Sequence, residues 1–552
     1  MMKTRLIPRT ESAREQPLLL KSLLAQTLRY NPEREIIYRD LFRMNYFEFN
    51  RRVRKLANLL IASGVKPGDT VAVLDWDSHR YLEAYFAVPA IGAVLHTVNV
   101  RLAPSQILYT INHAEDKLLL VHEDFLPLLY SIQGEITTVE NYIILSDHIY
   151  TNPTYEITAK VPGVVGEYES LLMTQPDQIE FPDFDEHTMA TIFYTTGTTG
   201  DPKGVYFSHR QLFLHSTALL TYFCGYQVLP FTHEDVYMPL TPMFHVHAWG
   251  FPFVATLLNN KQVYPGKYEP EILLKLLVTH NVTLSHCVPT ILNMLVSSPV
   301  SKLIDLSRWK VIIGGAALTR NLAKAAGSLN IQVTQGYGMS ETAPVMAVVH
   351  FSEEDKKLPE EEILDLKTKT GKISPFVELR IVNDEGDFLE HDGIATGELV
   401  ARGFSLTQGY LKNPVASEVL WRNGWLHTGD VASIDKKDIV SIKDRTKDVI
   451  KTGGEWISSL DIENLISQTE GVSEVAVIGL QDTVWGERPH AIVVPKESTK
   501  GLEARIRARL QCMIDAGDIK KWYMPDTISF TEAIPKTSVG KTDKKKLRAD
   551  RN

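Results

Sequence analysis

Helix and strand patterns alternate along most of the chain, and this alternation limits most strongly what the chain can fold into. Residues 46–63 (YFEFNRRVRKLANLLIAS) place apolar side chains at three- and four-residue steps, which predicts an amphipathic helix with Gly64 as its C-cap. The following apolar run, TVAVLDW, suits a buried strand. The same order recurs at 273–288 and 321–338. Repeated alternation predicts an α/β fold built on largely parallel sheets.

The pattern changes once, near residue 440. A predicted strand, 439–443, runs into the charged segment 444–448 (DRTKD), and about a hundred residues follow in the order strand, helix, strand, strand, helix and a lysine-rich tail. A chain of 552 residues is long enough for several units at roughly 100–200 residues each. We therefore expect a large multi-lobed N-terminal domain (1–443), a hinge (444–448) and a small mobile α+β C-terminal domain (449–552).

Charge and cysteine usage exclude some classes of protein. The formal net charge of −9 argues against non-specific nucleic-acid binding, which needs a basic face. The three cysteines are far apart and form no CxxC pair, which favours a reducing, cytoplasmic setting. The N-terminus has no signal-peptide pattern, and the apolar run 84–95 is shorter than the ~20 residues of a membrane-spanning helix. We expect a soluble protein and leave surface association with a membrane open.

The segment 194–205, YTTGTTGDPKGV, is too small and polar for a core element. Backbone amides of a Gly/Thr loop can converge on an anion, threonine hydroxyls add donors, and Lys203 adds a positive charge suited to a phosphate. A strand-like run precedes the loop and a helix-like run follows it. The spacing differs from GxxxxGK[ST], so the loop predicts phosphate binding of a kind other than that of P-loop NTPases. The alternative is a glycine-rich surface turn.

Five motifs together resemble those of the adenylate-forming enzymes, a family that includes acyl-CoA synthetases, luciferases and peptide-synthetase adenylation domains. The loop matches [ST][ST]G[ST][ST]GxPKG, and the others match the family in order: GYGMSET (336–342), WLHTGD (425–430), DRTKD (444–448) and PKTSVGK (535–541). The resemblance covers about residues 25–548. The strings MFHVHAW (243–249) and KTGGEWISS (451–459) are similar to those of bacterial fatty-acyl-CoA synthetases.

The resemblance implies that ATP, Mg²⁺ and CoA bind to the chain. Thr195 and Glu341 would be the metal-side residues, because Mg²⁺ on nucleotide phosphates usually takes one or two carboxylates; a solvated loop glutamate is the alternative for Glu341. The remaining predicted nucleotide- and CoA-contacting residues are Thr196, Gly197, Thr198, Thr199, Gly200, Lys203, Gly315, Gln335, Gly336, Tyr337, Ser340, Thr342, Asp430, Arg445, Lys447, Lys451 and Trp456.

Two of these positions have a chemical reason of their own, and one position near the hinge departs from the family pattern. Tyr337 offers a flat face for adenine, although a core tyrosine would fit the string equally well. The Asp430 carboxylate can accept hydrogen bonds from both ribose hydroxyls, with a turn or N-cap aspartate as the alternative. Asp438 stands where the family commonly has glycine, and aspartate tolerates a left-handed turn moderately well.

Lys541 is the predicted catalytic lysine. A carboxylate that attacks an α-phosphate is an anion approaching an anion, and a cation that reaches both oxygens lowers this barrier. Small residues around Lys541 would let its loop enter a narrow site, whereas Lys544, Lys545 and Lys546 are expected to be ordinary solvated lysines. By family analogy the small domain then turns about Asp444 and presents the 453–456 loop, so that the CoA thiol attacks the acyl-adenylate.

The acid is harder to predict than the reaction. By family position His245, Trp249 and Gly314 border the acyl pocket, although the aromatic segment around Trp249 would also suit an ordinary core. A medium- or long-chain fatty acid is our first expectation. An aryl, branched or thioether short-chain acid, transfer of the acyl group to a carrier protein, or a luciferase-like oxidation are alternatives. The partners expected are small molecules, and a homodimer is one alternative for the oligomeric state.

Overall fold

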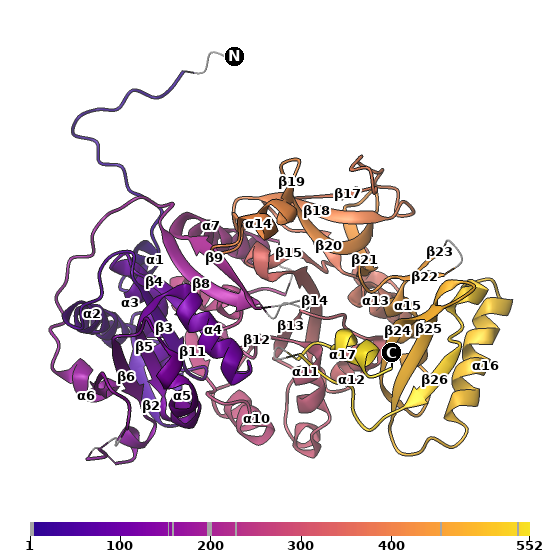
Figure 1. The fold of residues 1–552 in the computed structure, drawn as a ribbon, viewed down its shortest axis with the longest axis horizontal. Coiled ribbons are helices and arrows are strands. Elements are labelled where there is room, and N and C mark those ends of the chain that lie inside the picture. The colour runs from indigo at the N-terminus through magenta and orange to yellow at the C-terminus, as the bar shows by residue number, and fades with distance from the viewer. Residues whose placement is uncertain are drawn as a thin grey trace.

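In the computed structural model (Figure 1), the described residues are 5–152, 154–156, 159–195, 201–226, 229–452, 455–537 and 540–551. Their strands form three sheets. Two sheets belong to residues before 446, and the third belongs to residues after 449. The prediction of a large α/β unit followed by a small α+β unit agrees with this architecture.

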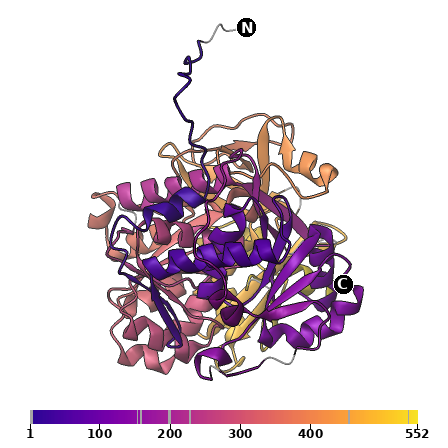
Figure 2. The same cartoon turned by 90° about the vertical axis from the view of Figure 1, so that its left-hand side faces the viewer.

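The first sheet has seven strands in the order β7-β6-β5-β3-β4-β8-β9 and is parallel except for the β8–β9 hairpin. Helices α2 (Tyr46–Ala62) and α3 (His79–Ala90) belong to the indigo part that faces the viewer in Figure 2, and every residue of α3 is buried. The strands are β3 (Thr70–Leu74), β4 (Val94–Thr97), β5 (Asp116–His122), β6 (Asn141–Leu145), β7 (Val164–Glu167), β8 (Met189–Thr195) and β9 (Lys203–Ser208).

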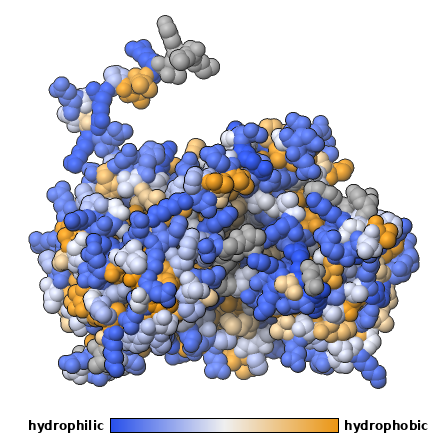
Figure 3. All heavy atoms as spheres, viewed as in Figure 1, coloured by the Kyte–Doolittle hydropathy of each residue, from blue (hydrophilic) through white to orange (hydrophobic). Residues whose placement is uncertain are grey.

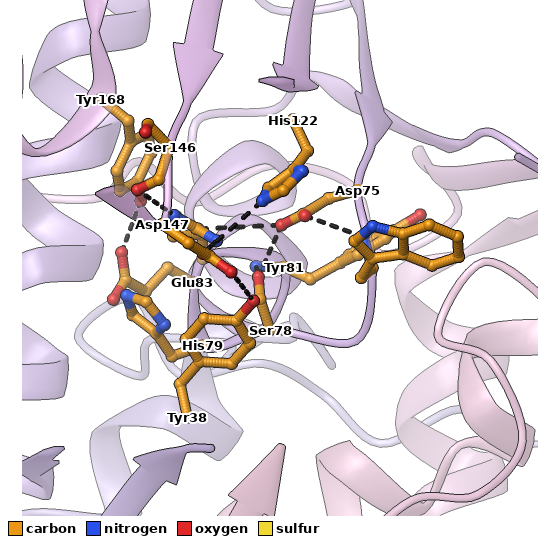
Figure 4. Close-up of polar contacts among 12 residues, drawn as sticks. Tyr38, Asp75, Ser78, His79, Tyr81, Glu83, His122, Ser146, Asp147 and Tyr168 are labelled. Atoms are coloured by element: carbon orange, nitrogen blue, oxygen red, sulfur yellow. Dashed lines mark hydrogen bonds and ion pairs between the residues drawn. The ribbon is translucent and has the colours of Figure 1, made fainter. Parts of the chain in front are cut away.

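Buried polar side chains fill the edge where β3, β5 and β6 end (Figure 4). The Arg80 guanidinium donates to the Ser146 carbonyl at 3.0 Å and to Asp147 at 2.7 Å, and Asp147 also accepts from the Tyr38 hydroxyl at 2.8 Å. Ligands of doubly wound sheets commonly bind at this edge. Here the chain's own ion pairs occupy it, and the candidate site lies elsewhere.

The second sheet has 14 strands, and its character changes at β14 (Gln332–Gly338). From β14 through β13, β12, β10 and β11 to β1 the strands are parallel, whereas from β14 through β15, β16, β21, β20 and β18 to β17 they are antiparallel. The antiparallel half was not predicted. The strands are β1 (Glu35–Tyr38), β2 (Phe42–Asn45), β10 (Val236–Tyr237), β11 (Lys261–Tyr264), β12 (Leu284–Cys287), β13 (Lys310–Ile313), β15 (Val345–Val348), β16 (Gly371–Ile373), β17 (Val377–Val382), β18 (Gly397–Gly403), β19 (Trp421–Arg422), β20 (Trp425–Ile434) and β21 (Ile439–Arg445).

The third sheet forms the small C-terminal unit, drawn in yellow in Figure 1. Its core is aliphatic and includes the fully buried side chains of Ile450, Ile462, Val477, Ile506 and Leu510. Its strands are β22 (Ile450–Thr452), β23 (Glu455–Ile457), β24 (Val472–Asp482), β25 (Gly486–Pro495) and β26 (Thr527–Phe530), and its helices are α15 (Ser459–Ser467), α16 (Leu502–Asp515) and α17 (Lys544–Ala549).

The elements predicted from periodicity are present. The helix at 46–63 is α2, and the helix–strand pairs at 273–288 and 321–338 are α10 (Pro270–Thr279) with β12, and α12 (Arg320–Ser328) with β14. The strand β9 (Lys203–Ser208), which begins within the last residues of the phosphate-loop motif, was missed because it is only six residues long and starts in a glycine-containing loop sequence.

Among the described residues, no helix is long and apolar enough to cross a membrane. The N-terminal arm projects from the body (Figure 3). Its Leu6 and Ile7 are 86% and 94% exposed.

Candidate active site

The phosphate-loop motif lies on the β8–β9 hairpin. Strand β8 is apolar and buried up to Tyr194, so the sheet brings Thr195 to its edge, where it pairs with Lys203 across the hairpin. The predicted phosphate-contacting residues between them, 196–200, lie outside the described residues. The structure thus places the two stems of the loop, Thr195 and Lys203, next to each other.

Strand β14 carries the next group of predicted residues to the centre of the large sheet. The Gln335 side chain accepts from the Leu318 amide at 2.7 Å and donates to the Ala316 carbonyl at 3.3 Å, so it braces the 314–317 loop. A Cβ at Gly338 would lie 1.7 Å from the Pro344 carbonyl oxygen, so only glycine fits this position. Through its two hydrogen bonds, Gln335 thus has a structural role, supporting the loop that borders the site.

Glu341 lies in the turn after β14 and is 7% exposed. Its Oε1 accepts from the Tyr410 hydroxyl at 2.7 Å, and the ammonium of Lys203 lies 4.8 Å from the centre of the Tyr410 ring. Tyr410 thus joins the predicted metal-side carboxylate to the phosphate-loop lysine. Sequence reasoning missed Tyr410, because it is an aromatic residue in a Gln-Gly-Tyr turn without a charge to mark it.

Asp430 and Arg445 face each other across β20 and β21. The Asp430 Oδ2 atom accepts from the Tyr337 hydroxyl at 2.6 Å, and its Oδ1 lies 3.6 Å from Arg445 Nε. Burial raises the pKa of Asp430, while Arg445 opposes this rise. The sequence predicted these three residues separately; the structure shows them as one group held by a hydrogen bond and an ion pair.

Lys541 reaches into the same region from the small unit. Its side chain passes close to Gly315: a Cβ added to this glycine would lie 3.4 Å from Lys541 Cε. Burial and the neighbouring Arg445 lower the pKa of Lys541 to about 8, against the opposing pull of Asp430 and Glu341. Lys545 and Lys546 are exposed as expected, but the expectation for Lys544 was wrong: its side chain is 10% exposed.

The predicted acyl-side residues line one pocket with Lys541. His245, Trp249, Gly314 and Gly315 share this pocket with Tyr337 and Ser340. A Cβ at Gly314 would come within 2.9 Å of the Trp249 indole, so the glycine lets the ring lie close against the strand end. Burial lowers the pKa of His245 to about 3, and the neighbouring Lys541 adds to this effect, so the imidazole is neutral.

The segment that carries Trp249 has an unusual backbone. Val246, His247, Ala248 and Trp249 have φ angles of 49°, 54°, 46° and 59°, which makes one left-handed turn of non-glycine residues. Such a conformation costs roughly 1–2 kcal/mol per residue. A tertiary contact supports the turn, since the His215 Nε2 atom lies 3.3 Å from the Trp249 carbonyl oxygen. The segment just before the turn is also held, because Asp77 Oδ1 accepts from the Met243 amide at 2.8 Å.

The other predicted residues differ in how closely they approach the pocket. The Thr342 hydroxyl donates to the Pro344 carbonyl at 2.6 Å and so closes its own turn. Lys447 is exposed, but partial desolvation lowers its pKa, and the neighbouring Arg445 adds to the effect. Lys451 is exposed on β22. The backbone of Trp456 belongs to β23, but its side chain lies outside the described part of the structure.

The donor set suits Mg²⁺ bound through nucleotide phosphates. Within the described residues there is no group of three or more His, Cys, Asp or Glu side chains that would hold a metal by itself. Glu341 offers a carboxylate and Thr195 a hydroxyl, and both are hard oxygen ligands. A nucleotide would have to supply the remaining ligands, which fits a site built to hold one.

The geometry defines one class of protein: a large α/β domain whose pocket, beside a phosphate-loop hairpin and a carboxylate, takes a lysine from a small C-terminal unit. Residues 24–411 match the AMP-binding enzyme family, and residues 461–541 match the AMP-binding enzyme C-terminal domain. The chain therefore belongs to the AMP-binding enzyme family.

Curated relatives cover nearly the whole chain. A long-chain-fatty-acid–CoA ligase of Thermus thermophilus is 40% identical over 92% of this chain and 90% of its own. A 3-methylmercaptopropionyl-CoA ligase of Ruegeria lacuscaerulensis is 36% identical over 97% of both chains. Among solved structures, ATP-bound MatB of Rhodopseudomonas palustris is 25% identical, with a TM-score of 0.81 over 97% of this chain and 99% of its own.

Proposed function

We propose that the protein is an ATP-dependent acid–CoA ligase that activates a medium- or long-chain fatty acid as acyl-AMP and then transfers the acyl group to CoA. Lys541 lines one pocket with Trp249 and Gly314, and the carboxylates of Asp430 and Glu341 lie close enough to Lys541 to influence its pKa. This arrangement carries the proposal. The names of the relatives support CoA as the acceptor, and they support more than one kind of acid.

In the proposed first step, the acid carboxylate attacks the α-phosphorus of ATP. A new carboxylate O–P bond forms, the bond to the β,γ-diphosphate breaks, and pyrophosphate leaves with the electron pair. The Lys541 ammonium lowers the repulsion between the two anions, and Lys203 and the β8–β9 hairpin hold the phosphates. Bound Mg²⁺ would neutralise phosphate charge, with Glu341 and Thr195 as its protein-side oxygens.

Asp430 and Tyr337 hold the other end of the nucleotide in this proposal. The Asp430 carboxylate is the acceptor for the ribose hydroxyls, with Arg445 and Lys447 beside it. Tyr337 orients Asp430 through its hydroxyl, and its ring contributes one side of the adenine site. Gly336 and Ser340 border the same space.

In the proposed second step, the CoA thiolate attacks the acyl carbonyl, the thioester forms, and AMP leaves. Lys541 is not needed here, since the acyl-adenylate is already activated. We propose that the small domain (449–552) turns about the hinge 444–448 between the two steps and exchanges Lys541 for the 453–456 segment, with Lys451 and Trp456 close to CoA. The glycines of that segment would allow the pantetheine arm to approach closely.

A second cavity supports an acid with an extended chain. It lies between α7 (His209–Leu220) and the 374–377 and 404–405 segments, and Val345 lines both this cavity and the pocket of Lys541. His215, Ala218 and Phe376 are among its lining residues. An acyl chain that passes Trp249 would reach this mostly apolar space, whereas a short acid would end before it.

The test is a panel of straight-chain C2 to C18 acids together with aryl and thioether acids, with AMP formation measured in the presence and absence of CoA. We expect the highest kcat/KM for straight-chain acids of roughly C8 or longer, because the shape of the pocket determines the discrimination between acids. We expect the product to be the CoA thioester only. Turnover confined to short, aryl or thioether acids would contradict the fatty-acid assignment. Pyrophosphate release that yields no acyl-CoA when CoA is present would contradict the CoA step.

Two variants test where the acyl chain of the substrate lies in the protein. Ala218→Trp should fill the second cavity and lower kcat/KM for C12–C16 acids by roughly tenfold or more relative to C4. The reason is that one methylene group gained or lost in an apolar pocket is worth ~1–3 kcal/mol. Trp249→Ala should change the ratio of long to short acids and leave the KM for ATP unchanged. A chain-length profile identical to that of the parent in both variants would place the acyl chain elsewhere.

A further inference from the structure

Lys544 makes two short polar contacts within the small domain. Its ammonium donates to the Ser459 hydroxyl at 2.5 Å and lies 2.7 Å from Glu463 Oε1. The side chains of Lys544 and Glu463 are only 10% and 18% exposed. Lys545 and Lys546 follow directly and are exposed, so Lys544 differs from both of its lysine neighbours.

Ser459 connects Lys544 to the large domain. The Ser459 amide and hydroxyl both donate to Asp444 Oδ2, at 2.6 and 2.5 Å. Asp444 is 2% exposed, and it pairs with Val431 as part of the large antiparallel sheet. The hydrogen-bond chain Asp444–Ser459–Lys544 therefore runs from the last strand of the large domain to the C-terminal segment.

The two carboxylates of this group depend on one ammonium. One ammonium serves the carboxylate of Glu463 directly and that of Asp444 through the serine, and Lys443 and Asp461 are the other charged groups nearby. Burial raises the pKa of Glu463, and Lys544 opposes this rise. Removing one partner of a buried ion pair leaves the other charge uncompensated, which is costly.

Lys541 lies three residues before Lys544, in a loop that is bonded to itself. The Thr537 amide donates to the Lys541 carbonyl at 2.7 Å, and the Asp543 amide donates to the Pro535 carbonyl at 2.9 Å. Asp543 also caps α17, because its side chain accepts from a backbone amide of the first turn. Because the loop is closed locally, its place relative to the large domain depends on where α17 is held. Lys544 provides one such tie, and the pair Arg548–Asp448, at 2.7 Å, provides another.

We propose that Lys544 is a positioning residue for acyl-adenylate formation: through Ser459 it ties the loop of Lys541 to Asp444, so that Lys541 is presented to the pocket only while this chain of hydrogen bonds is intact. The inference rests on the proposed function for the role of Lys541. It predicts that Lys544 acts on the first half-reaction and not on the second, although it touches no substrate.

The experiment compares Lys544→Met, which keeps length and removes charge, with the matched exposed control Lys545→Met. Adenylation is measured as pyrophosphate release in a single turnover without CoA, and thioester formation is measured from supplied acyl-AMP. We expect Lys544→Met to slow adenylation by roughly tenfold or more, about 1.4 kcal/mol, and to leave thioester formation within about twofold of the parent. Lys545→Met should match the parent in both.

Ser459→Ala breaks the same chain of hydrogen bonds but leaves the ion pair of Glu463 with Lys544 in place. It can therefore replace Lys544→Met in the test if that variant folds poorly. It should slow adenylation in the same direction, and the double variant should be less than additive. Equal slowing of both half-reactions, or parent-like adenylation in Lys544→Met and Ser459→Ala, would overturn the inference. Thermal unfolding midpoints show whether a loss reflects folding alone.

A readout without turnover separates this inference from the proposed function. Labelling of Lys541 by an amine-reactive reagent, quantified by mass spectrometry, should be faster in Lys544→Met than in the parent or in Lys545→Met. Unchanged labelling would count against the tie. If no acid is activated by the parent protein, the proposed function fails, while the labelling result still decides whether Lys544 positions Lys541.

Discussion

At the scale of single residues, the surroundings of Lys541 determine its charge at working pH. The ammonium is removed from water and lies near the guanidinium of Arg445, and both effects lower its pKa to about 8. Asp430 and Glu341 oppose the shift, so the lysine remains mostly protonated at neutral pH. A cation of this kind suits a step in which a carboxylate meets a phosphate.

This environment predicts an alkaline limit for adenylation. Below a pH of about 8 the proton is bound and the rate is full; above it, the kcat/KM for adenylation should fall by roughly tenfold per pH unit as the charged form is lost. The kcat/KM for thioester formation from supplied acyl-AMP should not show this fall at alkaline pH. A pH profile of the two half-reactions measures both. The same alkaline fall in both half-reactions, or in neither of them, would contradict the assignment of Lys541.

Glu341 provides a second prediction at this scale. Glu341→Gln keeps the hydrogen bond from Tyr410 but replaces a carboxylate by a weaker neutral ligand for Mg²⁺, so the Mg²⁺ concentration needed for half-maximal adenylation should rise. Tyr410→Phe, the matched control, keeps the carboxylate and should depress the rate with a smaller change in the Mg²⁺ requirement. Superimposable magnesium titrations of Glu341→Gln and the parent would make Glu341 a structural loop residue.

At the scale of secondary-structure elements, the β20–β21 hairpin shows how a substitution in a motif is accommodated. Asp438 stands where glycine is common in the family, and its φ of 59° is left-handed. The hairpin is intact: the Asp438 amide donates to the Asp435 carbonyl at 3.0 Å, and the Asp435 carboxylate accepts from the Ile439 amide at 3.0 Å. Aspartate therefore holds the turn, with neighbouring side-chain hydrogen bonds to support it.

The turn predicts the effect of two substitutions at Asp438. Asp438→Gly should leave the unfolding free energy of the large domain unchanged or raise it by less than about 1 kcal/mol, because glycine adopts this φ without strain. Asp438→Val should lower it by roughly 1–2 kcal/mol, because a β-branched side chain is disfavoured there. Thermal or urea unfolding of the two variants decides. Equal stability of the valine and glycine variants would mean that the turn relaxes out of the left-handed region.

At the scale of the whole molecule, the two domains meet where one sheet ends and another begins. Strand β21 ends at Arg445 and β22 begins at Ile450, and Asp444 bonds α15 from the large-domain side. The pocket takes Lys541 from the small domain and its other lining residues from the large one. Any change in the angle between the domains would therefore move Lys541 relative to the rest of the site.

Asp444→Pro should disturb this junction. Proline fixes φ near −65°, removes an amide and removes the carboxylate that holds Ser459, so it disfavours the arrangement seen here. We expect adenylation to fall well below the parent rate while thioester formation from acyl-AMP is affected less. Asp444→Asn is the control for the side chain, because it removes the carboxylate charge but neither fixes φ nor removes the backbone amide. Parent-like rates in both half-reactions, or equal losses, would count against a hinge at this position.

The sequence by itself was sufficient for the α/β class, the family and several of the helices and strands. Periodicity located α2, α10 and α12 because each has an apolar face spaced for burial, and such local patterns survive in any tertiary setting. The motifs marked Glu341, Asp430, Lys203 and Lys541 because charged residues among glycines stand out along a chain. Their individual roles stay predictions.

Only the tertiary structure decided how these residues are paired. Tyr410 reaches Glu341 and Lys544 reaches Ser459 across 69 and 85 residues of chain, and no local pattern encodes contacts at such separation. The left-handed turn at 246–249 is locally unfavourable, and contacts from other elements support it: His215 contacts the turn itself, and Asp77 holds the segment just before it. The half of the large sheet that is antiparallel follows from pairing between distant strands. Local propensity determined which segments form helices and strands, whereas long-range packing and buried hydrogen bonds determined which of them meet at the site.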